Sequence, residues 1–340
     1  MRALVLGGSR FVGPKLVAEL VWHDHTVDVL NRGATPAELP HGVGRIYANR
    51  QDPQAMASAL VGREYDVAYD VSGLAPPETK TTLELLAGRV RHYIYVSTSA
   101  VYERRWTAPV TEDCPYNEVE GLAYGYNKAA TEKVLFSAYR EMGFPVSVVR
   151  PWMLFGPGNS IPSREQLVFL RVQLGRPVFL PYNGYIHIQY GHVQDLARAM
   201  VMMAGNPRCI GQSYNVTGPD AITLNGYLQV IASLMGREVT VVYLDYADAL
   251  EEAGSHLDLL PFPWQYSRIA SIDKAREHFG FWPEFDSRRC TEDSLRWYLA
   301  ELAGSMGYDF TAEDAMLDRY GDRARWAAIT PAGEMPEVVR

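Results

Sequence analysis

The clearest chemical signal in the sequence is a tyrosine and a lysine four residues apart, Tyr124 and Lys128. Residues with this spacing lie on one face of a helix, one turn from each other. A phenol with an ordinary pKa of about 10 is a weak base at neutral pH, and a neighbouring ammonium lowers that pKa. Such a pair can move a proton at a substrate oxygen while a nicotinamide takes or gives a hydride. On spacing alone, a surface pair without a role is the better interpretation, so the place of the pair in the fold must decide.

Hydroxyl side chains follow an aromatic and β-branched run that predicts a strand over residues 92–97. Ser97, Thr98 and Ser99 stand at its carboxyl end. A hydroxyl at this position could hydrogen-bond the reacting oxygen opposite the tyrosine. Capping of the strand end by small polar residues explains them equally well, and the residues alone leave both interpretations open.

The chain begins with an apolar run over residues 3–6, followed by two glycines and a helical pattern over about 11–22. In this context a glycine turn can cradle a pyrophosphate, because glycines permit close backbone approach and the helix presents free N–H groups. An ordinary strand–helix turn is the alternative. Arg10 stands where the common motif has its middle glycine. The expected dinucleotide contacts in this turn are Gly7, Ser9, Arg10, Phe11, Val12 and Gly13.

Strands and helices alternate through the first half of the chain. The patterns predict further strands over residues 26–30, 45–48, 66–71 and 146–149, and helices over 53–61, 78–88 and 122–142. The alternation predicts an α/β fold of the Rossmann type, with a doubly wound parallel sheet. Ligands of such sheets bind beyond the carboxyl ends of the strands, which favours a functional role for Tyr124 and Lys128. The same argument adds Ser72 and Pro151 to the expected cofactor contacts.

The end of the second predicted strand bears on the choice of cofactor. Enzymes that select NAD usually place an acidic residue there, which would repel a 2′-phosphate. This chain has Asn31 followed by Arg32, and Arg10 could approach the same ribose from the glycine turn. Because a guanidinium matches a phosphate with paired hydrogen bonds, we expect NADP in preference to NAD. The alternative is that Arg32 points to solvent and Arg10 packs on the adenine.

The regular alternation breaks after Pro151. Residues 1–150 are expected to form the dinucleotide-binding domain, with later returns from about 192–217. Residues 151–320 are expected to form mainly a smaller C-terminal α/β substrate-binding lobe, and 321–340 a loosely held tail. An aromatic cluster in the lobe either lines a substrate pocket or packs as a lid or core: Phe262, Trp264 and Tyr266.

Composition excludes several classes of function. The formal net charge of −8 disfavours a nucleic-acid binder, whose phosphate contacts usually leave a basic footprint. The three cysteines are widely spaced, which indicates neither a disulfide framework nor a metal site. His23 and His25 flank Asp24, but no partner at ligand spacing follows, so no metal is expected. No apolar run reaches the length of a membrane span and no leader pattern begins the chain, so we expect a cytoplasmic protein without membrane contact.

Taken together, these motifs resemble the extended short-chain dehydrogenase/reductase family, the NAD-dependent epimerase/dehydratase group. The resemblance covers nearly the whole chain, including residues 109–113, Arg150-Pro151, 155–158 and 192–197. In that family the catalytic Ser or Thr stands four residues before a tyrosine, which here is Tyr102 and leads back to Thr98. The resemblance therefore implies a catalytic set of Thr98, Tyr124 and Lys128, with Lys128 also holding the nicotinamide ribose.

Departures from the family pattern narrow the reaction. Ser99 and Ala100 stand where sugar dehydratases carry an Asp-Glu pair and sugar-acid decarboxylases a glutamate. Hydride transfer or epimerisation is therefore favoured over elimination or decarboxylation. Ile188 and Gln189 stand where many nucleotide-sugar enzymes of the family carry an Arg-Asp pair that clamps the diphosphate. Charge for such a substrate would have to come from elsewhere, and the candidates are Arg164, Arg171 and Arg268.

The sequence is still more similar to an atypical branch of the family that includes the chloroplast stem-loop-binding proteins. The shared stretches are the Arg10 glycine loop, residues 191–193, 282–285 and 310–314. Some members of that branch bind RNA and lack the tyrosine–lysine pair, which this chain keeps.

The preferred interpretation is an NAD(P)-dependent oxidoreductase or epimerase acting on a secondary alcohol or ketone of a sugar-like substrate, with or without a nucleotide attached. The alternatives are an NADPH-dependent ketoreductase on a non-sugar metabolite and a non-catalytic RNA- or dinucleotide-binding protein. A homodimer is expected from the resemblance, through a helix bundle that includes residues 122–142.

Overall fold

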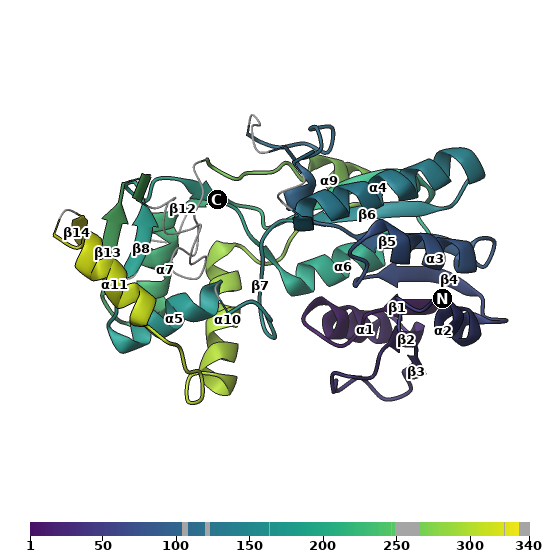
Figure 1. Cartoon of the computed structure of the whole chain (residues 1–340), viewed down its shortest axis with the longest axis horizontal. Coiled ribbons are helices and arrows are strands. Elements are labelled where there is room, and N and C mark those ends of the chain that lie inside the picture. The colour runs from purple at the N-terminus through teal and green to yellow at the C-terminus, as the bar shows by residue number, and fades with distance from the viewer. Residues whose placement is uncertain are drawn as a thin grey trace. The chain divides into compact units, whose positions relative to one another are not determined.

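A computed structural model describes residues 1–103, 108–119, 123–162, 164–245, 247–248, 266–322 and 324–332 (Figure 1). The chain forms two compact units. The first comprises Met1–Leu154, Gly191–Thr217 and Ala270–Glu284, and the second Phe155–Tyr190, Gly218–Ile269 and Phe285–Arg340. Two of the expected aromatic cluster, Phe262 and Trp264, lie outside the described residues.

A seven-stranded parallel sheet is the frame of the first unit, in the order β11-β6-β5-β4-β1-β2-β3. Its strands are β1 (Arg2–Leu6), β2 (Thr26–Asn31), β3 (Gly44–Tyr47), β4 (Tyr65–Asp70), β5 (Val90–Val96), β6 (Val146–Pro151) and β11 (Gln212–Val216). The central strands read as unbroken apolar runs because both faces of the sheet are covered. The expected α/β fold with a doubly wound parallel sheet is confirmed.

Helices cover both faces of this sheet (Figure 1). Alternate residues of β1 show the two cores: Ala3 and Val5 pack with one set of helices, and Leu4 and Leu6 with the other. The first set is α1 (Val12–Trp22), α6 (Val193–Met203) and α9 (Asp273–Phe279). The second set is α2 (Pro53–Leu60), α3 (Pro76–Leu86) and α4 (Ala123–Met142). Short 3-10 turns complete the unit, η1 (Ser99–Val101) and η2 (Pro207–Cys209).

The second unit has a three-stranded sheet, β14-β13-β8, and its own apolar core. The strands are β8 (Val178–Pro181), β13 (Val239–Leu244) and β14 (Arg325–Ile329), with a two-stranded pair of β9 (His187–Ile188) and β12 (Ile222–Thr223). The helices are α5 (Glu165–Leu174), α7 (Leu224–Met235), α10 (Ser287–Glu301) and α11 (Thr311–Tyr320). Of two further short strands, β10 (Gly191–His192) belongs to the first unit, and β7 (Leu154–Phe155) spans the point where the chain passes from the first unit to the second.

One of these elements differs from the sequence-based expectation. Strand β14 lies inside the range expected to be a loose tail, and it pairs antiparallel with β13 from Val239↔Ile329 to Tyr243↔Arg325. Helix α10 begins at Ser287 and is capped by Asp286, which accepts a hydrogen bond from the Arg289 N–H. None of the helices in the described part of the chain combines the length and apolarity that a bilayer crossing needs.

Candidate functional site

The glycine turn between β1 and α1 leaves no room for a side chain at Gly7 or Gly13. A Cβ on Gly13 would lie 2.6 Å from the Cα of Gly8, and one on Gly7 would lie 2.5 Å from the Cβ of Ser72. Gly7 also has a φ of +102°, which side chains strongly disfavour. The turn therefore brings bare backbone to the start of α1, where the first helical N–H groups have no helical acceptor. Such a turn fits a pyrophosphate, which needs approachable N–H groups at a helix N-terminus.

Asn31, at the end of β2, is a structural link between the glycine turn and the chain that follows. Its Nδ2 donates to Ser9 Oγ at 2.8 Å, and its Oδ1 accepts from the Gly33 N–H at 2.8 Å. Arg32 is exposed. Arg10 is also exposed, and its guanidinium donates to Thr35 Oγ1 at 3.2 Å. Exposed cationic side chains are thus present in the glycine turn and directly after β2.

Lys128, on the second turn of α4, is buried although its helix begins near the surface. Its ammonium donates to two backbone carbonyl oxygens, Gly73 at 2.6 Å and Val96 at 2.7 Å. The Val96 carbonyl ends β5 and the Gly73 carbonyl lies in the turn after β4, so the lysine joins these two neighbouring segments to the helix. Burial lowers the pKa of Lys128 to about 8, against the opposing effect of the Asp70 carboxylate. The lysine is therefore a cation that is only moderately stable at neutral pH.

Tyr124 lies one turn before Lys128 on α4, and 53% of its surface is exposed. The helix approaches the strand end very closely at Gly125, where a Cβ would lie 2.3 Å from the carbonyl oxygen of Ala100. This contact brings the first turn of α4 against η1, the short turn that follows Thr98. The exposed phenol and the buried ammonium thus come from one helix at the carboxyl edge of the sheet.

Thr98 is partly exposed, and its Oγ1 accepts from the Ala100 N–H at 3.2 Å as the cap of η1. The neighbouring Ser97 differs, since it is buried and donates to Glu132. Glu132 also receives the Arg150 guanidinium, with the nearest pair of atoms 2.6 Å apart. The Ser97 hydroxyl is therefore already bonded within a buried ion-pair network, so the Thr98 hydroxyl is the more available of the two to a substrate.

The remaining expected cofactor contacts lie along the same edge of the sheet. Ser72 follows β4 and packs on Gly7, and Pro151 ends β6. Phe11 has a φ of 43° and directly precedes α1, whose first residue is Val12. The carboxyl ends of β1, β2, β4, β5 and β6 thus bring together the candidate residues that the sequence had scattered over the first half of the chain.

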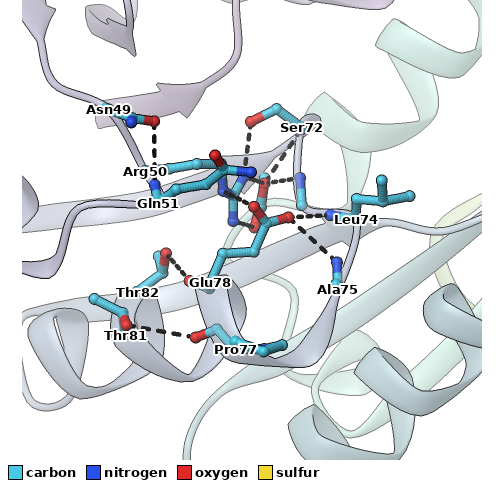
Figure 2. Close-up of polar contacts among 12 residues, drawn as sticks. Asn49, Arg50, Gln51, Ser72, Leu74, Ala75, Pro77, Glu78, Thr81 and Thr82 are labelled. Carbon is cyan, nitrogen blue, oxygen red and sulfur yellow. Dashed lines mark hydrogen bonds and ion pairs between the residues drawn. The ribbon is translucent and has the colours of Figure 1, made fainter.

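A charged cluster beside this edge was not anticipated from the sequence. Arg50, in the turn after β3, donates to both oxygens of Asp70 at 2.7 and 2.9 Å and to Ser72 Oγ at 2.7 Å. Its Nε lies 3.5 Å from a carboxylate oxygen of Glu78 on α3 (Figure 2). Asp70 is fully buried, and its pKa is lowered to about 2, chiefly because the charge of Arg50 outweighs the effect of burial. The available signal was an aspartate, Asp70, at the carboxyl end of a mostly apolar strand.

One of the arginines considered for a substrate diphosphate is excluded. Arg171 is fully buried within α5 and pairs with Glu313 at 3.0 Å, so its charge is already neutralised inside the second unit. Arg164 lies just before α5, and the Arg268 N–H donates to the carbonyl of His187. Within the described ranges, no three His, Cys, Asp or Glu side chains come together as a metal site would need.

One known protein family and several individual proteins match this chain. The family described as "NAD dependent epimerase/dehydratase family" matches residues 3–217. The chain is 29% identical to the chloroplast stem-loop binding protein of 41 kDa b from Arabidopsis thaliana, covering 94% of this chain and 84% of that one. It is 25% identical to the UDP-glucose 4-epimerase of Corynebacterium glutamicum, covering 91% and 98%.

The fold has solved counterparts. The structure of UDP-glucuronic acid 4-epimerase from Bacillus cereus in complex with NAD superimposes with a TM-score of 0.73. The match covers 90% of this chain and 99% of that one at 18% sequence identity. At this identity, the likeness establishes the fold.

Proposed function

The chain belongs to the NAD-dependent epimerase/dehydratase family, and within it we propose an NAD(P)-dependent oxidoreductase or epimerase that acts on a secondary alcohol or ketone of a sugar-like substrate. The observation that carries this proposal is the buried Lys128 one helical turn from the exposed Tyr124, at the sheet edge that also holds the glycine turn. A relative named as a UDP-glucose 4-epimerase supports a sugar as the substrate class.

The nicotinamide dinucleotide, when bound, supplies the hydride acceptor or donor. The glycine turn with Gly7 and Gly13 would hold its pyrophosphate, and Ser9, Phe11, Val12, Ser72 and Pro151 are proposed as further contacts. A turn from which a Cβ is excluded at two positions supports this assignment. Lys128 is the proposed contact of the nicotinamide ribose.

The proposed proton transfer uses the phenol of Tyr124. The positive charge of Lys128 favours the ionised phenol, so that Tyr124 can accept a proton from a substrate hydroxyl or return one to a substrate oxygen. Thr98 would orient that oxygen by a hydrogen bond from the opposite side. The absence of a carboxylate at Ser99 and Ala100 supports hydride transfer or epimerisation over an elimination.

The phosphorylated cofactor, NADP, is the proposed preference. The family description names NAD, but this chain has Asn31 and not an acidic side chain at the end of β2. Asn31 holds Ser9 and Gly33, and the exposed Arg32 and Arg10 provide the charges that a 2′-phosphate needs.

The cofactor proposal is tested by measuring dissociation constants for NADPH and NADH through the fluorescence of the reduced nicotinamide. We expect tighter binding of NADPH in the parent chain, and a loss of that preference in Arg32→Ala. An NADH preference in the parent, or an unchanged ratio in the variant, would show that Arg32 does not read the phosphate.

The reaction is tested with a panel of UDP-sugars, dTDP-sugars and simple ketones. Absorbance at about 340 nm follows net consumption or formation of reduced cofactor, and chromatography detects epimers formed without net change. Bound oxidised cofactor in the purified protein would favour an epimerase, and ready exchange a reductase. Failure to bind any nicotinamide dinucleotide would contradict the proposal.

A further inference from the structure

One buried carboxylate, that of Asp70, holds the turn after β4 through hydrogen bonds to the backbone of the turn. Asp70 Oδ1 accepts from the backbone N–H groups of Ser72 at 3.2 Å and Gly73 at 2.7 Å. The other oxygen, Oδ2, accepts from the phenol of Tyr93 at 2.6 Å. With the two bonds from Arg50, the carboxylate of Asp70 is hydrogen-bonded on every side, and its orientation determines the path of the Ser72–Gly73 backbone.

A second carboxylate holds the next part of the same turn. Glu78 Oε1 accepts from the N–H groups of Leu74 and Ala75, as Figure 2 shows. The Nε of Arg50 faces the other oxygen of Glu78. Arg50 therefore bridges the two carboxylates that hold residues 72–75, and its charge makes their burial together possible.

This turn touches both halves of the candidate site. Ser72 packs against the glycine turn so closely that a Cβ on Gly7 would collide with its side chain. The carbonyl oxygen of Gly73 receives the ammonium of Lys128 at 2.6 Å and the phenol of Tyr95 at 3.0 Å. A movement of the turn would therefore displace the Gly73 carbonyl, one of the two hydrogen-bond acceptors of Lys128.

We propose that Arg50 and Asp70 are positioning residues for the reaction: through the Gly73 carbonyl they place Lys128, and through their opposite charges they set how readily Lys128 holds its proton. The role of Lys128 in the reaction rests on the proposed function, whereas the dependence of Lys128 on Arg50 and Asp70 does not.

The charges around Lys128 give the direction of each effect. Asp70 stabilises the ammonium, and Glu132 on α4 and Glu78 on α3 act in the same sense. Arg50 opposes them. The ring of Tyr95 on β5 lies 4.7 Å from Nζ, and Tyr124 lies one turn before Lys128 on α4. Because Arg50 and Asp70 have opposite signs, their removal must shift the proton affinity of Lys128 in opposite directions.

The test uses the whole chain and nuclear magnetic resonance of lysine side chains labelled at Cε. The sequence contains only five lysines, Lys15, Lys80, Lys128, Lys133 and Lys274, and Lys128→Met assigns the signal. In the parent we expect Lys128 to titrate with a pKa of about 8. Asp70→Asn should lower this pKa and Arg50→Gln should raise it, each by about one pH unit. The double variant should return close to the parent value.

Asp195→Asn is the matched control. Asp195 is equally buried, pairs with Arg198 at 2.7 Å and caps the Glu284 N–H, so its loss should lower the melting temperature without moving the Lys128 titration. The proposal would be overturned if the pKa of Lys128 moved in the same direction in both single variants, or if it did not move in folded variants. If Asp70→Asn does not fold, the Lys128 titration in Arg50→Gln is the deciding measurement: a raised pKa supports the proposal, and an unchanged or lowered pKa overturns it.

Activity provides the second readout. Once a substrate is found, the pH profile of turnover should move with the measured pKa of Lys128, downward in Asp70→Asn and upward in Arg50→Gln. Opposite pKa shifts in a chain that binds no dinucleotide would support this inference and reject the proposed function, so the two failures are distinguishable.

Discussion

At the scale of single residues, the proposed function depends most on the environment of Lys128. A buried ammonium usually needs an anionic partner, but the two acceptors of Lys128 are neutral backbone carbonyls, one in the turn after β4 and one at the end of β5. The negative charge of Asp70 lies behind one of those carbonyls and is itself paired with Arg50. This arrangement holds the cation in place while its burial lowers its pKa, which suits the proposed role of Lys128, in which its charge would act on the phenol of Tyr124.

Thr98→Val tests the hydroxyl at the end of β5. The substitution keeps the shape of the side chain and removes its oxygen, which would orient the substrate and also caps η1 through the Ala100 N–H. We expect turnover to fall about 5–10-fold, the equivalent of one hydrogen bond, with dinucleotide affinity retained. Thr98→Ser keeps the hydroxyl and should remain near the parent rate. An undiminished rate in Thr98→Val would leave Thr98 with its capping role alone.

The sequence supplied the candidate residues of the proposed site but not their surroundings. The pair Tyr124 and Lys128 could be recognised because helical spacing is a local property. The partners of Lys128 could not be recognised, because they are backbone carbonyls, which every residue has. Arg50 and Asp70 were missed because they are 20 residues apart, and only the parallel pairing of strands brings them together.

At the scale of elements, the close approach of α4 to η1 places the phenol. Gly125→Ala would put a Cβ 2.3 Å from the Ala100 carbonyl oxygen, which is backbone and cannot rotate away. We expect the first turn of α4 to be pushed from the strand end, with a loss of turnover of about 100-fold, the effect of a displacement near 1 Å. Steady-state kinetics and the melting temperature are the measurements.

Gly304→Ala is the control for this substitution, because a Cβ there meets no atom within 4 Å. It should leave turnover and melting temperature unchanged. A Gly125→Ala variant with the parent turnover would show that α4 tolerates the displacement, and the proposed role of the contact would be wrong.

Elements that depend on local patterns were predicted well, and those that depend on distant partners were not. The strands of the large sheet and helices α1 to α4 follow from apolar runs and periodicity. Strand β14 has only a short apolar run, residues 326–329, beside a charged and proline-containing stretch, and its partner β13 lies more than 80 residues earlier. Strand β8 is only four residues long and lies in a stretch rich in glycine and proline.

At the scale of the whole molecule, His92 links segments that are far apart in the sequence. Its Nδ1 accepts from the Gly205 N–H at 3.1 Å, so Nε2 carries the proton and donates to Ser147 Oγ at 2.7 Å. Ser147 in turn donates to the carbonyl of Cys209. Strands β5 and β6 and the connection from α6 to β11 are thereby joined through one neutral imidazole. Burial lowers the pKa of His92 to about 4.

This histidine predicts acid sensitivity of the fold. Below its ordinary pKa of about 6.5 the unfolded chain binds a proton that the folded chain refuses until about pH 4, so stability falls as the pH drops between these values. The parent loses free energy of unfolding between pH 7 and pH 4.5, and in His92→Gln this loss should be smaller by on the order of 2–3 kcal/mol. Denaturant unfolding at both pH values measures it, and an equal loss in parent and variant would contradict the prediction.

The most direct test of the central claim is the turnover of Tyr124→Phe on whichever substrate of the panel the parent converts. The variant loses only the hydroxyl, and a fall of about 10²–10⁴-fold is expected, with the dissociation constant of the dinucleotide little changed. Tyr126→Phe, two residues along the same helix and on a different face, should keep the parent rate. Near-normal turnover in Tyr124→Phe would contradict the claim that this phenol moves the proton.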